Sequence, residues 1–219
     1  GARSDIENVP IENLQAFYHK WYQPDNAVLT VSGKFDETKV LTWITETFGK
    51  IPRPTRVLPA EWTVEPVADG PRYFEIRRPG ESQLVAVGYR IPSAIAADNN
   101  AVETAVDVLS SAPRGRLYKA LVETGMAGQV FGWAMSAKCP SFVMFGAMVK
   151  KGDDIERVKN VLIDTVENAF KKTPADETEV GLSLAEAATD FERTLSDPEE
   201  FAVELSDYIS LGDWRLYFY

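Results

Sequence analysis

A proline-rich stretch divides this chain of 219 residues and limits what it can fold into. Residues 51–70 and the position just after them contain five prolines (52, 54, 59, 66 and 71) and show no helical or strand periodicity. Such a composition predicts a linker. The roughly fifty residues before it are too few to fold alone without disulfides or metals. We therefore expect residues 1–50 to be the incomplete end of one domain and residues 71–219 to form most of another.

The chain contains a single histidine, His19, and a single cysteine, Cys139. These counts exclude an internal disulfide and every metal motif that needs two imidazoles. His19 lies among aromatic residues in a predicted amphipathic helix, where we expect a packing or surface role. Cys139 precedes a proline between two predicted strands, and we expect a buried or reduced thiol, because no histidine can activate it unless His19 is adjacent. The sequence predicts no catalytic residue and no metal ligand here.

The formal charge of −10 comes from the last third of the chain. Residues 151–219 contain seven basic and seventeen acidic residues, whereas the segments 1–60 and 61–150 are each balanced. A surface that binds DNA or RNA needs the opposite sign. We expect the acids to form the solvent-exposed face of helices, the alternative being a surface that steers basic peptides toward a site. No apolar run approaches the ~18 residues that a membrane-spanning helix needs.

Apolar periodicity predicts the elements on either side of the linker. The first piece contains a helix from Pro10 to Tyr22, a strand over 27–33, and a helix that Asp36 caps and that ends at Gly49. After the linker we predict strands over 72–77, 83–90, 129–137 and 141–149, and helices over 98–110, from Pro113, and over 153–171, 176–195 and 198–212. Strand pairs followed by helices favour an α+β fold, with an antiparallel sheet and helices packed on one face.

Three segments carry a resemblance to a known family. Residues 17–36, FYHKWYQPDNAVLTVSGKFD, match the pattern F-x-x-x-[WY]-Y-x-P-x-N-A-x-L-x-x-x-G-x-x-[DN]. Residues 112–123 are similar to a small-small-R-L-x-x-x-L-[RV]-E helix, and residues 205–216 to an E-x-x-x-x-G-D-W-R-L segment. In this order they resemble the pitrilysin/insulinase family of zinc metallopeptidases over essentially the whole chain. The resemblance implies repeated α+β domains of the mitochondrial-processing-peptidase type, here the end of the first repeat and most of the second.

The resemblance also implies what this segment lacks. The family binds zinc through an H-x-x-E-H motif and a later glutamate, and both would precede residue 1. A substrate-binding arginine and tyrosine of the family correspond here to Val122 and Gln129, which cannot replace a guanidinium or a phenol. The implied function is therefore the non-catalytic second repeat of a large bacterial zinc endopeptidase, walling the substrate chamber. Zinc belongs to the parent protein, and the isolated segment is expected to be inactive.

Two other readings of the function remain open at this stage. The parent can be a non-catalytic family member that acts as a scaffold or peptide-binding partner, or the chain can be a self-standing module that binds peptides at a strand edge. Arg114 and Arg116 flank a glycine near a helix start, where they can contact a peptide carboxylate, although solvated helix-end charges are the expectation. The implied partners are peptide substrates and the remaining repeats of the parent chain. Similarity to exported bacterial members favours the periplasm.

Overall fold

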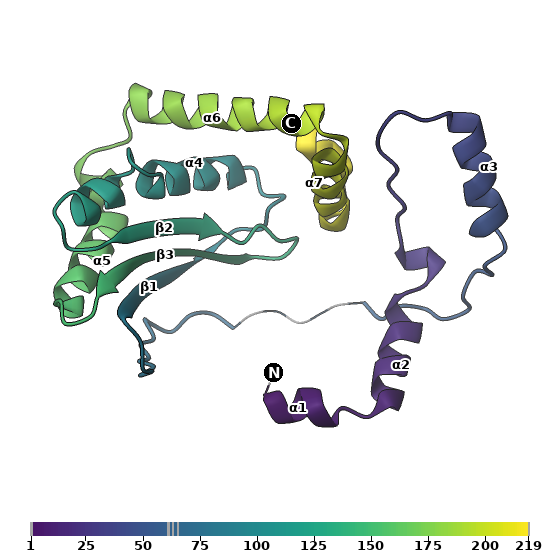
Figure 1. Cartoon of the computed structure of the whole chain (residues 1–219), viewed down its shortest axis with the longest axis horizontal. Helices are drawn as coiled ribbons and strands as arrows, with labels where there is room; N and C mark the ends of the chain where they lie inside the picture. Colours follow the sequence, from purple (N-terminus) through teal and green to yellow (C-terminus); the bar gives the residue numbers. More distant parts are fainter. Residues whose placement is uncertain (1, 61, 63, 65, 219) are drawn as a thin grey trace. The chain divides into compact units, whose positions relative to one another are not determined.

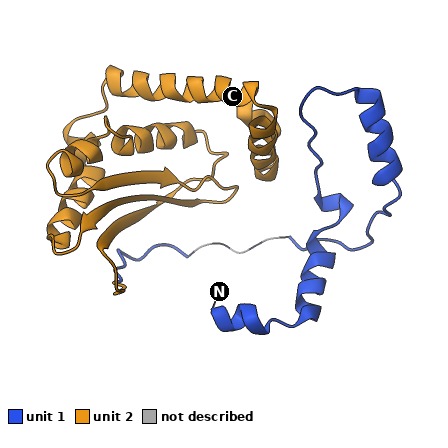
Figure 2. Ribbon diagram, in the orientation of Figure 1, with its two compact units in different colours: residues 1–74 blue, residues 75–219 orange. Residues whose placement is uncertain are grey.

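The computed structural model describes residues 2–60, 62, 64 and 66–218, and the chain forms two compact units, residues 1–74 and 75–219 (Figure 2). We call them unit 1 and unit 2. In its described residues unit 2 contains an antiparallel sheet of order β1-β3-β2 (Figure 1). Its strands are β1 (Ser82–Ile91), β2 (Gln129–Ala134) and β3 (Ser141–Lys150), which confirms the strands predicted over 83–90, 129–137 and 141–149.

One face of this sheet carries the core of unit 2. The register places Val85 of β1 and Val130 of β2 on either side of Ala147 of β3, so all three point to the same face. Helix α4 (Asn99–Ser110) packs against β2, and α5 (Ile155–Lys172) packs against β1 and β3. Since the helices lie on this one face, the predicted α+β class with an antiparallel sheet is confirmed.

Two further helices extend the helical side of unit 2. Helix α6 (Glu177–Ser196) lies over α4, and α7 (Pro198–Leu211) continues to the short helix η3 (Trp214–Phe218) (Figure 1). Carboxylates cap these helices at the predicted starts, because Asp176 accepts a hydrogen bond from Glu179 N–H and Asp197 accepts from Glu199 N–H. An aromatic cluster joins α6, α7 and η3.

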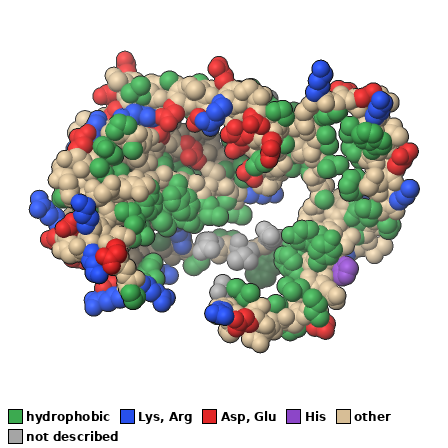
Figure 3. Space-filling model, viewed as in Figure 1, with side chains coloured by type: hydrophobic (Ala, Val, Ile, Leu, Met, Phe, Trp, Pro, Cys, Tyr) green, Lys and Arg blue, Asp and Glu red, His purple; other side chains and the backbone are tan. Residues whose placement is uncertain are grey.

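The acidic residues of the last third lie at the surface. Thirteen of the seventeen are exposed and the other four are half-buried, which confirms the predicted solvent-exposed face. Figure 3 shows acidic side chains on the surface of α6 and α7. Within the described part of the chain, none of the helices has both the length and the apolar character that crossing a membrane requires.

Unit 1 consists of short helices without a core of their own. They are α1 (Arg3–Asn8), α2 (Ile11–Trp21), the 3-10 turn η1 (Pro24–Asn26) and α3 (Glu37–Thr47). Asp36 caps α3 as predicted, its carboxylate accepting from Lys39 N–H at 3.0 Å. None of these helices contains a buried residue. Hydrophobic side chains are instead uncovered over α2 and α3 (Figure 3).

Three predicted elements differ from the structure. Residues 27–33 and 72–77 form no strand, so both strand predictions are wrong. Residues 27–33 are a β-rich run and residues 72–77 alternate, which suits a strand in both cases. A strand also needs a hydrogen-bonded neighbour, and neither segment has one among the described residues. The helix predicted from Pro113 begins only at Arg116, because residues 112–115 form a turn, and it continues as the π-helix η2 (Tyr118–Val122).

Unit 1 and unit 2 are expected to differ in amide hydrogen exchange. Residues 1–50 should exchange faster than the strands β1 and β3, because the helices of unit 1 cover no buried side chain whereas Val149 and Ala147 are fully buried. Mass-spectrometric exchange on the intact chain measures both at once. Equal protection of the two regions would show that residues 1–50 are packed more firmly than the structure indicates.

A close approach between α4 and β2 makes Gly132 a sensitive position. A methyl group at Gly132 would lie 2.6 Å from Ser110 Cβ and 2.7 Å from Phe145 Cδ1. Gly132→Ala is therefore expected to lower the free energy of unfolding by about 1–3 kcal/mol. Gly88→Ala in β1 is the matched control, since its methyl group meets only Val143 O at 3.7 Å. Urea denaturation compares them, and equal stabilities would contradict the close approach.

Candidate functional site

The residues most often used for metal binding and nucleophilic catalysis are scattered. His19 lies on the exposed side of α2, with its ring 6.0 Å from that of Tyr18. Cys139 is a free thiol in the β2–β3 connection and is exposed, so of the two expected states, buried or reduced, the structure has the reduced thiol and not a buried one. In the described part of the chain, no three His, Cys, Asp or Glu side chains lie together where they could hold a metal ion.

The two positions that the sequence resemblance matches to substrate-binding residues of the family, Val122 and Gln129, lie on either side of the η2–β2 turn. Val122 ends η2, is half-buried and packs against the core. Gln129 is the exposed first residue of β2 and lies opposite Met148 of β3. Neither side chain carries a charge, so this edge of unit 2 supplies no guanidinium to a peptide carboxylate.

Arg116 is held inside unit 2 by a dense set of contacts. Its Nε and Nη2 donate to the two carboxylate oxygens of Glu179 at 2.8 and 2.5 Å, and its Nη1 donates to the carbonyl of Thr173 at 2.7 Å. The guanidinium also lies 5.0 Å from the centre of the Phe170 ring. The hydrogen bond from Arg116 is the main reason why the pKa of Glu179 lies below its usual value.

Arg114 is paired in the same way, to a different pair of acids. Its Nη2 donates to Asp107 of α4 at 2.5 Å, and its Nη1 lies 2.6 Å from Glu186 of α6. Although burial raises the pKa of Asp107, hydrogen bonds from Ser111, Ser183 and Arg114 outweigh it and leave that pKa below its usual value. The two arginines are therefore neither solvated helix-end charges, as the sequence suggested, nor available to a peptide carboxylate.

An apolar groove of about 390 Å³ lies between α4, α5 and the sheet. Val102 and Leu109 of α4, Phe145 of β3 and Val166 of α5 are among its lining residues. At its polar end Tyr89 Oη donates to Glu167 Oε1 at 3.1 Å, and burial together with this contact raises the pKa of Tyr89 to about 12. Such a groove can receive apolar side chains, but its lining residues include no nucleophile paired with a base.

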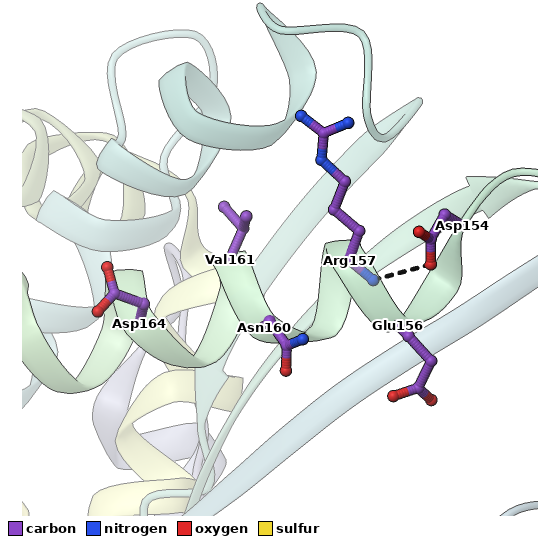
Figure 4. Close-up of a pocket in the computed structure, with 6 residues that line it drawn as sticks. All are labelled: Asp154, Glu156, Arg157, Asn160, Val161 and Asp164. Carbon is purple, nitrogen blue, oxygen red and sulfur yellow. Dashed lines mark hydrogen bonds between the residues drawn. The ribbon is translucent and has the colours of Figure 1, made fainter.

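A second, shallower groove follows the exposed first turns of α5 (Figure 4). Asp154 caps the helix by accepting from Arg157 N–H at 3.0 Å, and Glu156 points away from that contact in Figure 4. Farther along, Asp164 accepts from Lys172 and Asn168, and these bonds lower its pKa. Each acid therefore has a local structural role or faces solvent, which does not indicate a binding site.

Most of the chain matches a known protein family. The model of the Peptidase M16 inactive domain matches residues 8–183. The chain belongs to the peptidase M16 inactive-domain family. This membership confirms the resemblance to zinc metallopeptidases that the sequence shows. It is also consistent with a non-catalytic, structural segment of such a peptidase.

Relatives of this inactive M16 domain agree in sequence and in fold. Zinc protease PqqE of Helicobacter pylori is 24% identical over 216 residues, which cover 97% of this chain but 48% of the relative. This chain thus spans about half the length of that curated relative. The structure of an inactive peptidase domain from Bordetella parapertussis is 34% identical, with a TM-score of 0.59, and covers 65% of this chain and 78% of that one. The match to the structure of a protease from Helicobacter pylori covers 98% of this chain and 52% of that chain, with a TM-score of 0.85 and 22% identity.

Sequence reasoning missed the two arginine networks of this inactive M16 domain. Arg116 and Glu179 are 63 positions apart, and the chain around Glu179 shows only an acidic helix start. Asp107 lies in α4, a helix that the sequence predicts from its apolar residues alone, so that prediction does not point to its carboxylate. The usable signal was the unusual pair of arginines on either side of one glycine, ahead of a long acidic segment.

Proposed function

We propose that this inactive M16 domain is the non-catalytic part of a zinc-dependent endopeptidase and walls the chamber in which the peptide is cut. The observation that carries the proposal is the match of the inactive-domain family to residues 8–183, which include parts of both units. Two arginines agree with it, because Arg114 and Arg116 are held in ion pairs within unit 2.

In the proposed parent protein, the zinc belongs to another domain, where it would activate a water molecule for attack on the peptide bond. This chain contributes rigidity instead. Its paired arginines tie the loop before η2 to α4, α6 and the α5–α6 connection, so the helical layer of unit 2 keeps one shape. Such a layer can support a wall that confines a substrate without contributing a reacting group.

The proposal predicts a sharp difference between the chain and its parent. Purified chain should hydrolyse no member of a fluorogenic peptide library, and the parent protein should hydrolyse peptides in a reaction that a zinc chelator abolishes. Hydrolysis by the chain alone, resistant to chelators and retained after further purification, would contradict the proposal. A parent that is inactive and lacks H-x-x-E-H would instead support a scaffold or peptide-binding role. The periplasmic location stays a prediction, which fractionation of the source cells tests.

A further inference from the structure

An ion pair joins the proline-rich linker to the turn at the end of α2. Arg56 Nη1 donates to Asp25 Oδ2 at 2.8 Å, and Arg56 Nη2 donates to Asp25 Oδ1 at 2.9 Å. The side chains are 20% and 24% exposed, so water screens this pair less than an ordinary surface pair. Arg56 Nε is buried and has no hydrogen-bond partner among the described residues. In the part of the chain that the structure describes, Asp25 is the one carboxylate that this guanidinium contacts.

The carboxylate of Asp25 is itself held in a defined place. Asp25 lies in η1. On one side of it Asn26 Nδ2 donates to the Trp21 carbonyl at 2.9 Å, and on the other side Gln23 Nε2 donates to the His19 carbonyl at 3.0 Å. These bonds fasten the turn to the end of α2 on both sides of Asp25. A carboxylate in such a fixed turn is a preorganised partner for a bidentate guanidinium.

The linker residues near Arg56 alternate in exposure. Pro54 and Leu58, two positions to either side of Arg56, are half-buried like Arg56, whereas Val57 is almost fully exposed. The same side of the chain is therefore partly covered at three successive alternate positions. Farther along, Val67 and Phe74 are strongly exposed. Proline content alone does not distinguish these two parts of the linker.

We propose that Asp25 and Arg56 form a strap that makes the first part of the linker, residues 52–58, a fixed portion of unit 1. The fixed part of unit 1 therefore ends at Leu58 and not before the first prolines. The strap thereby shortens the connection that remains between this fixed part and unit 2, and it sets the residue at which that connection starts. The proposal concerns this chain whatever the parent protein catalyses, so it does not depend on the proposed function.

Trypsin provides a direct test, because it must draw an arginine side chain into its S1 pocket before it can cut. In the intact chain, the bond Arg56–Val57 should be cut slowly relative to Arg72–Tyr73, since Arg72 is exposed. Asp25→Ala should raise the ratio of these two rates about fivefold to thirtyfold, which corresponds to a pair worth one to two kcal/mol. Limited digestion followed by mass spectrometry gives the ratio within one sample.

Matched variants separate the strap from a general loosening of unit 1. Asp36→Ala removes the cap of α3 and leaves Asp25 in place, so it should not change the ratio. Asp25→Asn keeps the shape of the side chain but removes its charge. It replaces Asp25→Ala in the digestion if Asp25→Ala does not give a native circular dichroism spectrum. An unchanged ratio in the Asp25 variants, or an equal rise in Asp36→Ala, would overturn the proposal.

Discussion

Replacing Leu121 by alanine is expected to lower the free energy of unfolding of unit 2 by about 3–4 kcal/mol. Leu121 lies in η2, is 0% exposed, and belongs to the core to which α5 and the sheet contribute. The substitution removes three carbon atoms from a site that neighbouring elements surround, because η2 packs against both α5 and β2. The lost transfer free energy and the cavity left behind therefore act together.

The same substitution at an exposed leucine is the matched control. Leu184 in α6 is 57% exposed, and alanine is at least as good a helix former, so Leu184→Ala should change stability by less than about 0.5 kcal/mol. Guanidinium denaturation followed by circular dichroism measures both variants. A loss of less than about 1 kcal/mol in Leu121→Ala would show that η2 is not part of the core.

Replacing Arg116 by methionine is expected to cost about 2–4 kcal/mol. Methionine keeps most of the apolar stem, but it removes the paired bonds to Glu179 and the bond to the Thr173 carbonyl. Arg116 is only 15% exposed, so water cannot fully replace these bonds. Thermal and urea denaturation of the variant against the natural chain give the difference.

Two substitutions show whether the geometry of Arg116 matters and not only its charge. Arg193→Met removes an arginine that is 66% exposed and 3.3 Å from Asp190, so the expected loss is at most about 1 kcal/mol. Arg116→Lys keeps the charge but loses the planar fork and should recover only part of the stability. Equal losses in Arg116→Met and Arg193→Met would contradict the buried network.

The pH dependence of stability provides a second readout of the Arg116–Glu179 pair. Because the pKa of Glu179 is lower in the folded chain than its ordinary value of 4.5, the pair stabilises the fold above that value. This contribution disappears as the pH falls through the lowered pKa. Stability measured from pH 7 downward should therefore fall less steeply below about pH 4.5 in Arg116→Met than in the natural chain.

The strands show what periodicity can and cannot predict. Residues 83–90 and 141–149 are rich in apolar and β-favouring residues and form β1 and β3, because each pairs with the other as an antiparallel neighbour. Residues 27–33 are a β-rich run as well, yet no strand forms there, since no described segment of unit 1 offers a hydrogen-bonded neighbour. A β-rich run predicts that a segment suits a strand, but a sheet depends on partners that a local pattern does not contain.

The side chains of the candidate site show a different limit. The capping role of Asp36 follows from its place at a helix start, and the structure confirms it, because the interaction spans only three positions. The pairing of Arg116 with Glu179 depends on how α6 returns over the earlier part of unit 2, which no short-range pattern specifies. Cys139 is likewise exposed in the connection between β2 and β3, which the residues next to it do not specify.

The zinc content of the purified chain tests the central claim most directly. After purification without chelators and dialysis against metal-free buffer, elemental analysis should find far less than one zinc per chain, because none of its described side chains form a ligand set. The same chain, stripped with a chelator and then given one equivalent of zinc, serves as the control and should lose that zinc on dialysis. One tightly held zinc per chain in either sample would contradict a non-catalytic role.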